Sequence, residues 1–163
     1  MALVFPARDA CFLVFSQRAD ARIEVAEWAR HGERFLRTRV ERKDASAAGD
    51  GASSLRESTA TIELGPLHEP GDPNARGVRT CWSRPRTEDD LVAATSAPGG
   101  AGLAALAERC PQVWLVGTEG RAEDDAPALR LAAILAGVLL GPILAPGGLS
   151  LFGPKTARQR LGL

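Results

Sequence analysis

The residues best suited to chemistry in this chain form two acidic clusters. Glu88-Asp89-Asp90 follows one short segment of strand-like composition, and Glu123-Asp124-Asp125 follows another. Carboxylate oxygens are the hard ligands that Mg²⁺ prefers, and a bound Mg²⁺ supports phosphoryl transfer or hydrolysis. The candidate metal ligands are Asp89, Asp90, Asp124 and Asp125.

Two predicted strands decide whether these clusters meet. Residues 77–83 alternate between two faces, residues 113–116 are all apolar, and helical segments lie between them. We expect a strand–helix–strand unit of this kind to be a parallel crossover, which brings the loops that leave both strands to one edge of the sheet. Ligands of open α/β sheets favour that edge. The candidate binding residues at the first of these loops are Trp82, Arg84 and Arg86.

Helix capping is the simpler interpretation of both clusters. Thr87 can accept a hydrogen bond from the backbone N–H of Asp90, and Pro127 suits the first turn of a second helix. Carboxylates in a first turn stabilise a helix by about 0.3–1 kcal/mol each without any ligand. The chain has no phosphate-loop, nucleophilic-serine, zinc-protease or paired CxxC motif, so the sequence identifies no catalytic residue. Capping is therefore favoured over metal binding.

Charge and cysteine content narrow the classes of function. Lys plus Arg equals Asp plus Glu, so the formal net charge is zero, which argues against nucleic acid as a partner. The Arg-rich stretch 30–43 is interleaved with Glu33 and Glu41, as a solvated face is. Three widely spaced cysteines indicate buried free thiols in a reducing compartment. The N-terminal residues lack the basic segment of a secretory signal, so we expect a cytoplasmic protein.

The apolar periodicity predicts an α/β (α+β) fold, in which a mixed sheet of about five strands carries helices in the order β-α-β-β-β-α-β-α. One domain is expected over residues 1–163, with a flexible loop at 44–58 and a basic tail at 153–163. The predicted strands cover residues 11–15, 35–42, 59–64, 77–83 and 113–116. The predicted helices cover about 19–30, 87–97, 102–110 and 128–140.

The C-terminal region is unusually apolar, because residues 131–154 carry no charge. Such a stretch is long enough to cross a bilayer as a helix of about 20 residues. Pro142 and Pro146 interrupt it, however, and the continuous helix at 128–140 has the length of a core helix. Three interpretations stay open: a helix packed on the sheet, which is favoured, a subunit-interface helix and a membrane segment.

The function favoured by these observations is that of a non-catalytic protein-interaction module without a cofactor. Its partner would be another protein or a second copy of the chain, bound through the apolar C-terminal helix, because a helix that is apolar nearly all round needs cover on more than one side. One alternative is a Mg²⁺-dependent phosphotransferase or hydrolase that uses the acidic clusters. The other is a membrane-tethered accessory protein.

Overall fold

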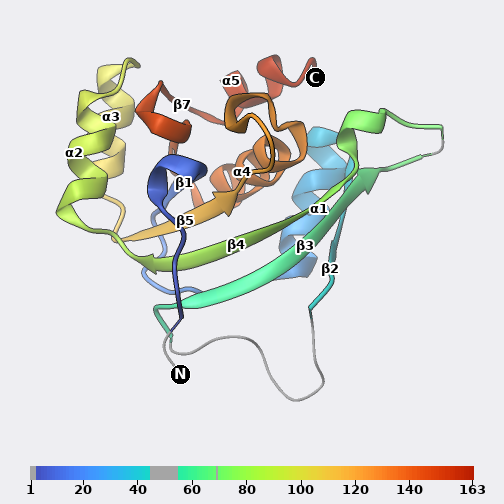
Figure 1. Cartoon of the computed structure of the whole chain (residues 1–163), viewed down its shortest axis with the longest axis horizontal. Helices are drawn as coiled ribbons and strands as arrows, with labels where there is room; N and C mark the ends of the chain where they lie inside the picture. The colour runs from blue at the N-terminus through green and yellow to red at the C-terminus, as the bar shows by residue number, and fades with distance from the viewer. Residues whose placement is uncertain (1–2, 45–54, 69) are drawn as a thin grey trace.

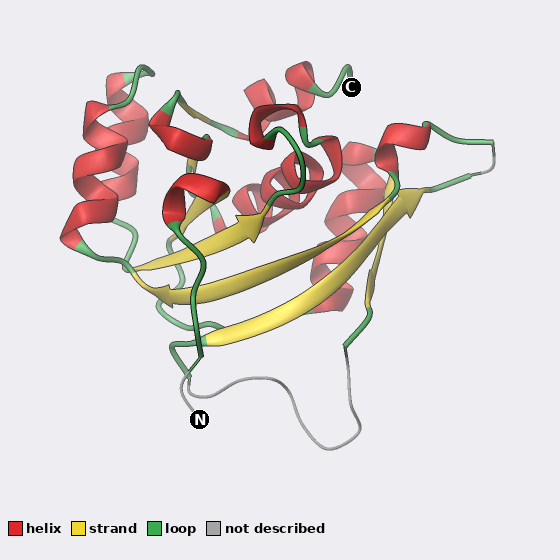
Figure 2. Cartoon of the chain, in the orientation of Figure 1, coloured by secondary structure: helices red, strands yellow, loops and turns green. Residues whose placement is uncertain are grey.

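An open antiparallel sheet forms the centre of the molecule (Figures 1 and 2). The computed structural model describes residues 3–44, 55–68 and 70–163. Neighbouring strands lie in the order β2-β3-β4-β5-β1-β6-β7, and every pair is antiparallel. The strands are β1 Cys11–Ser16, β2 Thr38–Arg42, β3 Ser58–Pro66, β4 Gly77–Pro85, β5 Gln112–Gly117, β6 Ile143–Leu144 and β7 Leu151–Phe152.

Five α-helices in the described part of the chain pack on this sheet. They are α1 Val25–Leu36, α2 Glu88–Ser96, α3 Ala101–Glu108, α4 Ala126–Leu139 and α5 Pro154–Arg160. Short 3₁₀ turns accompany them: η1 Arg8–Ala10, η2 Pro73–Ala75, η3 Ala122–Asp124 and η4 Pro146–Gly148. In Figure 1, α2 and α3 lie side by side at one end of the sheet, α4 lies over its middle strands, and α1 lies beside β2.

The helices create two apolar cores, one on each face of the sheet. On β1, Phe12 and Val14 belong to the core with α1 and α4, whereas Leu13 and Phe15 belong to the core with α2 and α3. Because successive strand residues point to opposite faces, a strand covered on both sides must be apolar throughout. That requirement explains the uninterrupted apolar run at the start of β1, which the sequence had indicated as a buried strand.

Helix α4 is covered by its own chain. It packs against β1, α1 and α5, and nearly all of its residues are buried. A second copy is therefore not needed to cover α4, which is a core helix. No helix among the described residues is long and apolar enough to cross a membrane.

The predicted parallel crossover is wrong, because β4 and β5 are antiparallel neighbours. The backbone N–H of Arg86 donates to the carbonyl oxygen of Pro111 at 3.0 Å, so the chain leaves β4 and re-enters β5 at one point. Helices α2 and α3 thus form a long excursion between two hairpin strands rather than a crossover. The combination of sheet and packed helices is confirmed, but the described residues form seven antiparallel strands in place of the expected mixed sheet of about five.

Smaller differences follow from tertiary packing. Helix α1 begins later than expected, and it continues through Gly32 to Leu36. Gly32 does not end the helix, because its missing side chain lets the helix pack closely on Val40 and Ile134. The predicted basic tail contains α5, which packs on α4. Most of the predicted flexible loop, residues 45–54, lies outside the described residues.

Candidate functional site

The two acidic clusters lie at opposite ends of β5. Helix α2 follows β4 and therefore starts beside the beginning of β5, whereas η3 and α4 follow the end of β5. The convergence on which the Mg²⁺ hypothesis rested is absent. Within residues 3–44, 55–68 and 70–163, no group of three or more His, Cys, Asp or Glu side chains has the arrangement of a metal site.

Asp90, one predicted metal ligand, is buried and held by Arg84. The Arg84 guanidinium donates to both carboxylate oxygens, at 2.6 and 3.0 Å, and Asp90 forms a capping box with Thr87 at the start of α2. Burial alone would raise the pKa of Asp90, but the hydrogen bonds from Arg84 and Thr87 lower it below the ordinary carboxyl value. The predicted cap is confirmed, and Arg84, a predicted binding residue, is engaged in it.

Asp125, a second predicted ligand, performs the same task for α4. Its carboxylate accepts hydrogen bonds from Arg79 Nε and Nη2, from the backbone N–H of Ala128, and from the backbone N–H of Glu119 at 2.6 Å. Asp125 thus caps α4, anchors the loop after β5 and neutralises Arg79. The other two predicted ligands, Asp89 and Asp124, are exposed.

The predicted binding residues Trp82, Arg84 and Arg86 do not share one site. Arg86 Nη1 donates to the carbonyl oxygens of Ala107 and Glu108, so this side chain closes the end of α3. Trp82 stands apart from the two structural arginines, half-buried at the border of the core formed by α2 and α3. Its indole lies so close to β5 that a Cβ at Gly117 would come within 3.2 Å of the ring.

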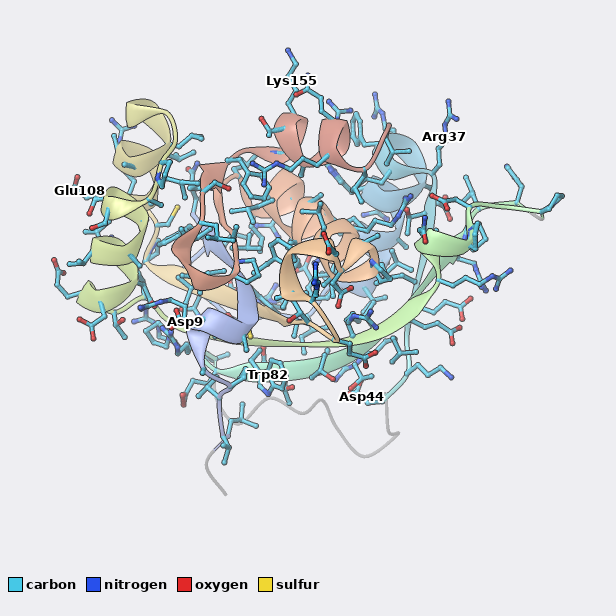
Figure 3. The ribbon with its side chains drawn as sticks, turned by 45° about the horizontal axis from the view of Figure 1, so that its top comes forward. Asp9, Arg37, Asp44, Trp82, Glu108 and Lys155 are labelled. Atoms are coloured by element: carbon cyan, nitrogen blue, oxygen red, sulfur yellow. The ribbon has the colours of Figure 1, made fainter. Side chains whose placement is uncertain are left out.

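Helices α2 and α3 cover one face of the sheet only in part, and beside Trp82 no other helix of the described residues lies on this face. We give the name open sheet face to nine residues of β2, β3, β4 and the position after β2 whose side chains point to this side, and none of them is fully buried. Arg84 of β4 points to the same side but is held by Asp90 of α2 and is not included. Figure 3 places Trp82 on the lower side of the strands, away from α5. The open sheet face consists of Arg39, Glu41, Lys43, Thr59, Thr61, Glu63, Val78, Thr80 and Trp82.

The charges of the open sheet face compensate one another. Arg39 pairs with Glu41 at 3.1 Å, and Lys43 pairs with Glu63 at 3.2 Å. The hydroxyls of Thr61 and Thr80 lie 3.3 Å apart. The surface is therefore polar but electrically neutral, with exposed apolar area supplied by Val78 and Trp82. Neutrality of this kind fits a protein partner better than a polyanion.

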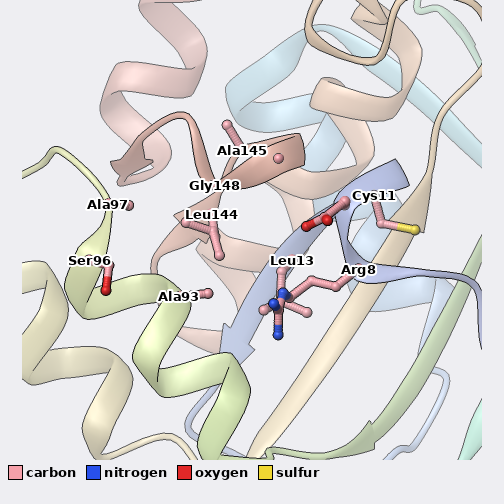
Figure 4. Close-up of a pocket in the computed structure, with 11 residues that line it drawn as sticks. Arg8, Cys11, Leu13, Ala93, Ser96, Ala97, Leu144, Ala145 and Gly148 are labelled. Atoms are coloured by element: carbon pink, nitrogen blue, oxygen red, sulfur yellow. The ribbon is translucent and has the colours of Figure 1, made fainter.

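A pocket of about 230 Å³ lies on the same face of the sheet as α2, between α2, η1 and η4 (Figure 4). Its wall includes Cys11, but burial raises the pKa of that thiol to about 11. Burial raises the pKa of Cys81 to about 12. Neither cysteine therefore has the thiolate character of a nucleophile at neutral pH. Cys81, beside Trp82, is a core thiol, in agreement with the structural interpretation of its sequence.

Known proteins do not identify either surface. Comparison of the chain with protein-family models, with curated proteins and with solved structures finds no match. The open sheet face is also the feature that sequence reasoning missed. Its alternating threonines in residues 59–64 were visible, but which strands lack a covering helix is a property of the fold.

Proposed function

We propose that this chain is a non-catalytic protein-interaction module that pairs with a second copy of itself through the open sheet face. This proposal is supported by the way α2 and α3 cover only the half of their sheet face near β1 and β5. In the part of the chain that the structure describes, no helix covers the other half, over β2, β3 and β4. Three free, buried cysteines support placing the protein in a reducing compartment such as the cytoplasm.

The charge pattern favours a second copy as the occupant. A two-fold dimer brings the same patch together from both sides, so a patch of one sign would repel itself. Arg39 and Lys43 are matched here by Glu41 and Glu63, and the face has no net charge. Two such faces can therefore meet without like-charge repulsion, and Val78 and Trp82 supply apolar area for burial.

The area of the open sheet face determines how strong a dimer we expect. Three strands about 4.8 Å apart, with about five residues each at ~3.4 Å per residue, give a patch of roughly 10 by 17 Å. A standard stable interface takes ~800 Å² of accessible surface from each partner, which is considerably more than this patch offers. We therefore expect a weak dimer that dissociates on dilution.

Tryptophan quenching reports on this face directly. Trp28 and Trp114 are fully buried, so acrylamide reaches mainly Trp82. We expect quenching to weaken as protein concentration rises, in step with a rise in weight-average mass measured by sedimentation velocity. A constant monomer mass up to millimolar concentration, with constant quenching, contradicts self-association.

Two variants that each replace an exposed valine with lysine test where the interface lies. Val78→Lys places a charge in the open sheet face, whereas Val92→Lys places one on the exposed surface of α2. The first should abolish the dimer and the second should leave it unchanged. Loss of the dimer in both, or in Val92→Lys alone, places the contact elsewhere. A different protein captured by the Val92→Lys variant but not by the Val78→Lys variant would show that the occupant is not a second copy.

A further inference from the structure

Arg130 is a charged residue in the middle of the most apolar helix of the chain. It lies in α4 between Leu129 and Leu131, and only 2% of its surface is exposed. Burying a guanidinium is costly unless every N–H finds an acceptor and the charge is paired. The partners of Arg130 therefore show whether the charge has been fully compensated.

Compensation of Arg130 is incomplete. Nη1 donates to the carbonyl oxygen of Leu36 and to the hydroxyl of Thr38, which are both neutral acceptors. Among the described residues, the one charged partner is Asp72, whose Oδ2 lies 3.2 Å from Nη2 and whose side chain is 47% exposed. Nε is buried and has no hydrogen-bond partner within residues 3–44, 55–68 and 70–163. Burial lowers the pKa of Arg130 despite the attraction of Asp72, which indicates that the positive charge is under-compensated.

The unfilled positions lie on one edge of the guanidinium. Nε–H and the adjacent Nη2–H point in parallel, and this edge matches the two oxygens of a single carboxylate. Asp72 engages only the Nη2 end, because its other oxygen accepts from the backbone N–H of Asn74 at the start of η2. The edge is thus half used by a side chain that is half in solvent.

This arginine is part of the wall of a pocket of about 520 Å³. The volume lies within the usual range for small-molecule sites, ~300–1,000 Å³. Pro66, Leu67 and Pro70 contribute apolar walls, and Arg37 adds a second positive charge. Among the described residues that line the pocket, Asp72 carries the only acidic side chain. An anionic group at the arginine and an apolar body along the prolines would suit this lining.

We propose that this pocket binds a small organic carboxylate, whose carboxylate group takes the Nε and Nη2 edge of Arg130 and displaces Asp72. The ligand's apolar body lies against Pro66, Leu67 and Pro70. Asp72 acts as the internal stand-in that holds the arginine when the ligand is absent. We favour an organic carboxylate over inorganic phosphate as the ligand, because the apolar walls of the pocket can pack against an apolar body but cannot form hydrogen bonds with a phosphate ion.

Hexanoate is a suitable probe, because it combines a carboxylate with a flexible apolar body. Binding to the folded state raises its thermal stability by mass action. We expect hexanoate to raise the Tm of the full chain in a saturable manner. Hexan-1-ol and inorganic phosphate at the same concentrations and ionic strength should not do so. Equal stabilisation by phosphate overturns the choice of an organic carboxylate.

The variant Asp72→Asn separates a binding site from a structural ion pair. Asparagine retains the oxygen that caps η2 but removes the carboxylate that competes for Arg130. We expect a lower Tm without ligand, restoration of the Tm by hexanoate, and an affinity for hexanoate about tenfold higher, which corresponds to ~1.4 kcal/mol. A lower Tm that hexanoate does not restore overturns the proposal, because Arg130 then has a structural role alone.

Two glutamine variants test the pocket without touching its buried arginine. Arg37→Gln removes a positive charge that lines the pocket, whereas Arg34→Gln removes one from the exposed side of α1. Hexanoate affinity, measured by calorimetry, should fall several-fold in the first variant and stay unchanged in the second. An equal effect of both variants points to general charge attraction and contradicts binding in this pocket.

Discussion

At the scale of single residues, the two buried acids among the candidate metal ligands, Asp90 and Asp125, hold helices in place. Asp125 is the clearest case, because one buried carboxylate serves Arg79, α4 and the loop after β5. Replacing it by asparagine keeps a capping oxygen but removes the buried charge partner of Arg79, which then pairs only with the exposed Glu119 among the described residues. Breaking a buried ion pair in this way costs ~3 kcal/mol. We expect Asp125→Asn to lower the free energy of unfolding by about that amount in urea denaturation.

Glu119 provides the matched control for Asp125. Its carboxylate also pairs with Arg79, at 3.4 Å, but its side chain is 73% exposed. An exposed pair of this kind contributes less than ~1 kcal/mol because water and salt screen it. Glu119→Gln should therefore leave the urea midpoint almost unchanged. A similar loss in both variants would contradict the assignment of the stabilisation to the buried contact between Asp125 and Arg79.

Asp90 links the same kind of contact to pH. Its pKa is lower in the folded chain than the ordinary value of 3.8, so the folded state binds fewer protons than the unfolded state in this range. The stabilisation is complete above pH 3.8 and is lost as the pH falls through the folded-state pKa. We expect the urea midpoint to drop below pH 4, and Asp90→Asn to flatten part of that drop. The exposed neighbour variant Asp89→Asn should keep the steep profile.

At the scale of elements, the exit of α4 depends on close contact between backbones. After the helix, Leu140 takes a left-handed conformation and Gly141 passes directly against β1. A Cβ on Gly141 would lie 1.8 Å from the carbonyl oxygen of Phe15, which belongs to the main chain of the interior strand β1 and cannot turn aside. Overpacking of this kind costs ~3 kcal/mol. We expect Gly141→Ala to destabilise the chain by at least about that amount in chemical denaturation.

Gly102 serves as the control for this effect. It lies exposed in α3, and a Cβ there would meet nothing within 4 Å. Alanine is a better helix former than glycine by ~1 kcal/mol, so Gly102→Ala should stabilise the chain slightly. If both alanine variants shift stability in the same direction, the close approach of Gly141 to β1 is not what limits this position.

At the scale of the whole molecule, stability should be graded across the sheet. Strand β1 lies between β5 and β6 with both faces covered, whereas β2 is an edge strand with one face open. Amides that open only through global unfolding exchange most slowly, and edge amides open locally. We expect β1 and β5 to give the slowest hydrogen exchange and β2 the fastest among the strands of more than two residues. Equal protection of β1 and β2 would contradict this gradient.

Local chemistry was enough to place most elements. The apolar run of β1, the alternation in β3 and the Thr87–Asp90 capping box are each set by neighbours in the sequence, so they could be predicted. The free, buried cysteines also agree with expectation. These features depend on the period of side chains and on hydrogen bonds three residues apart, both of which can be read from the chain itself.

The tertiary structure alone decided strand direction, and with it the fate of the predicted site. Whether α2 and α3 cross the sheet or return beside it depends on what they pack against, which no local pattern encodes. Their return made β4 and β5 antiparallel and moved Asp90 and Asp125 to opposite ends of β5. Packing also decided which half of the sheet stays open, and it placed Arg130 beneath a pocket, because burial is a property of distant segments meeting.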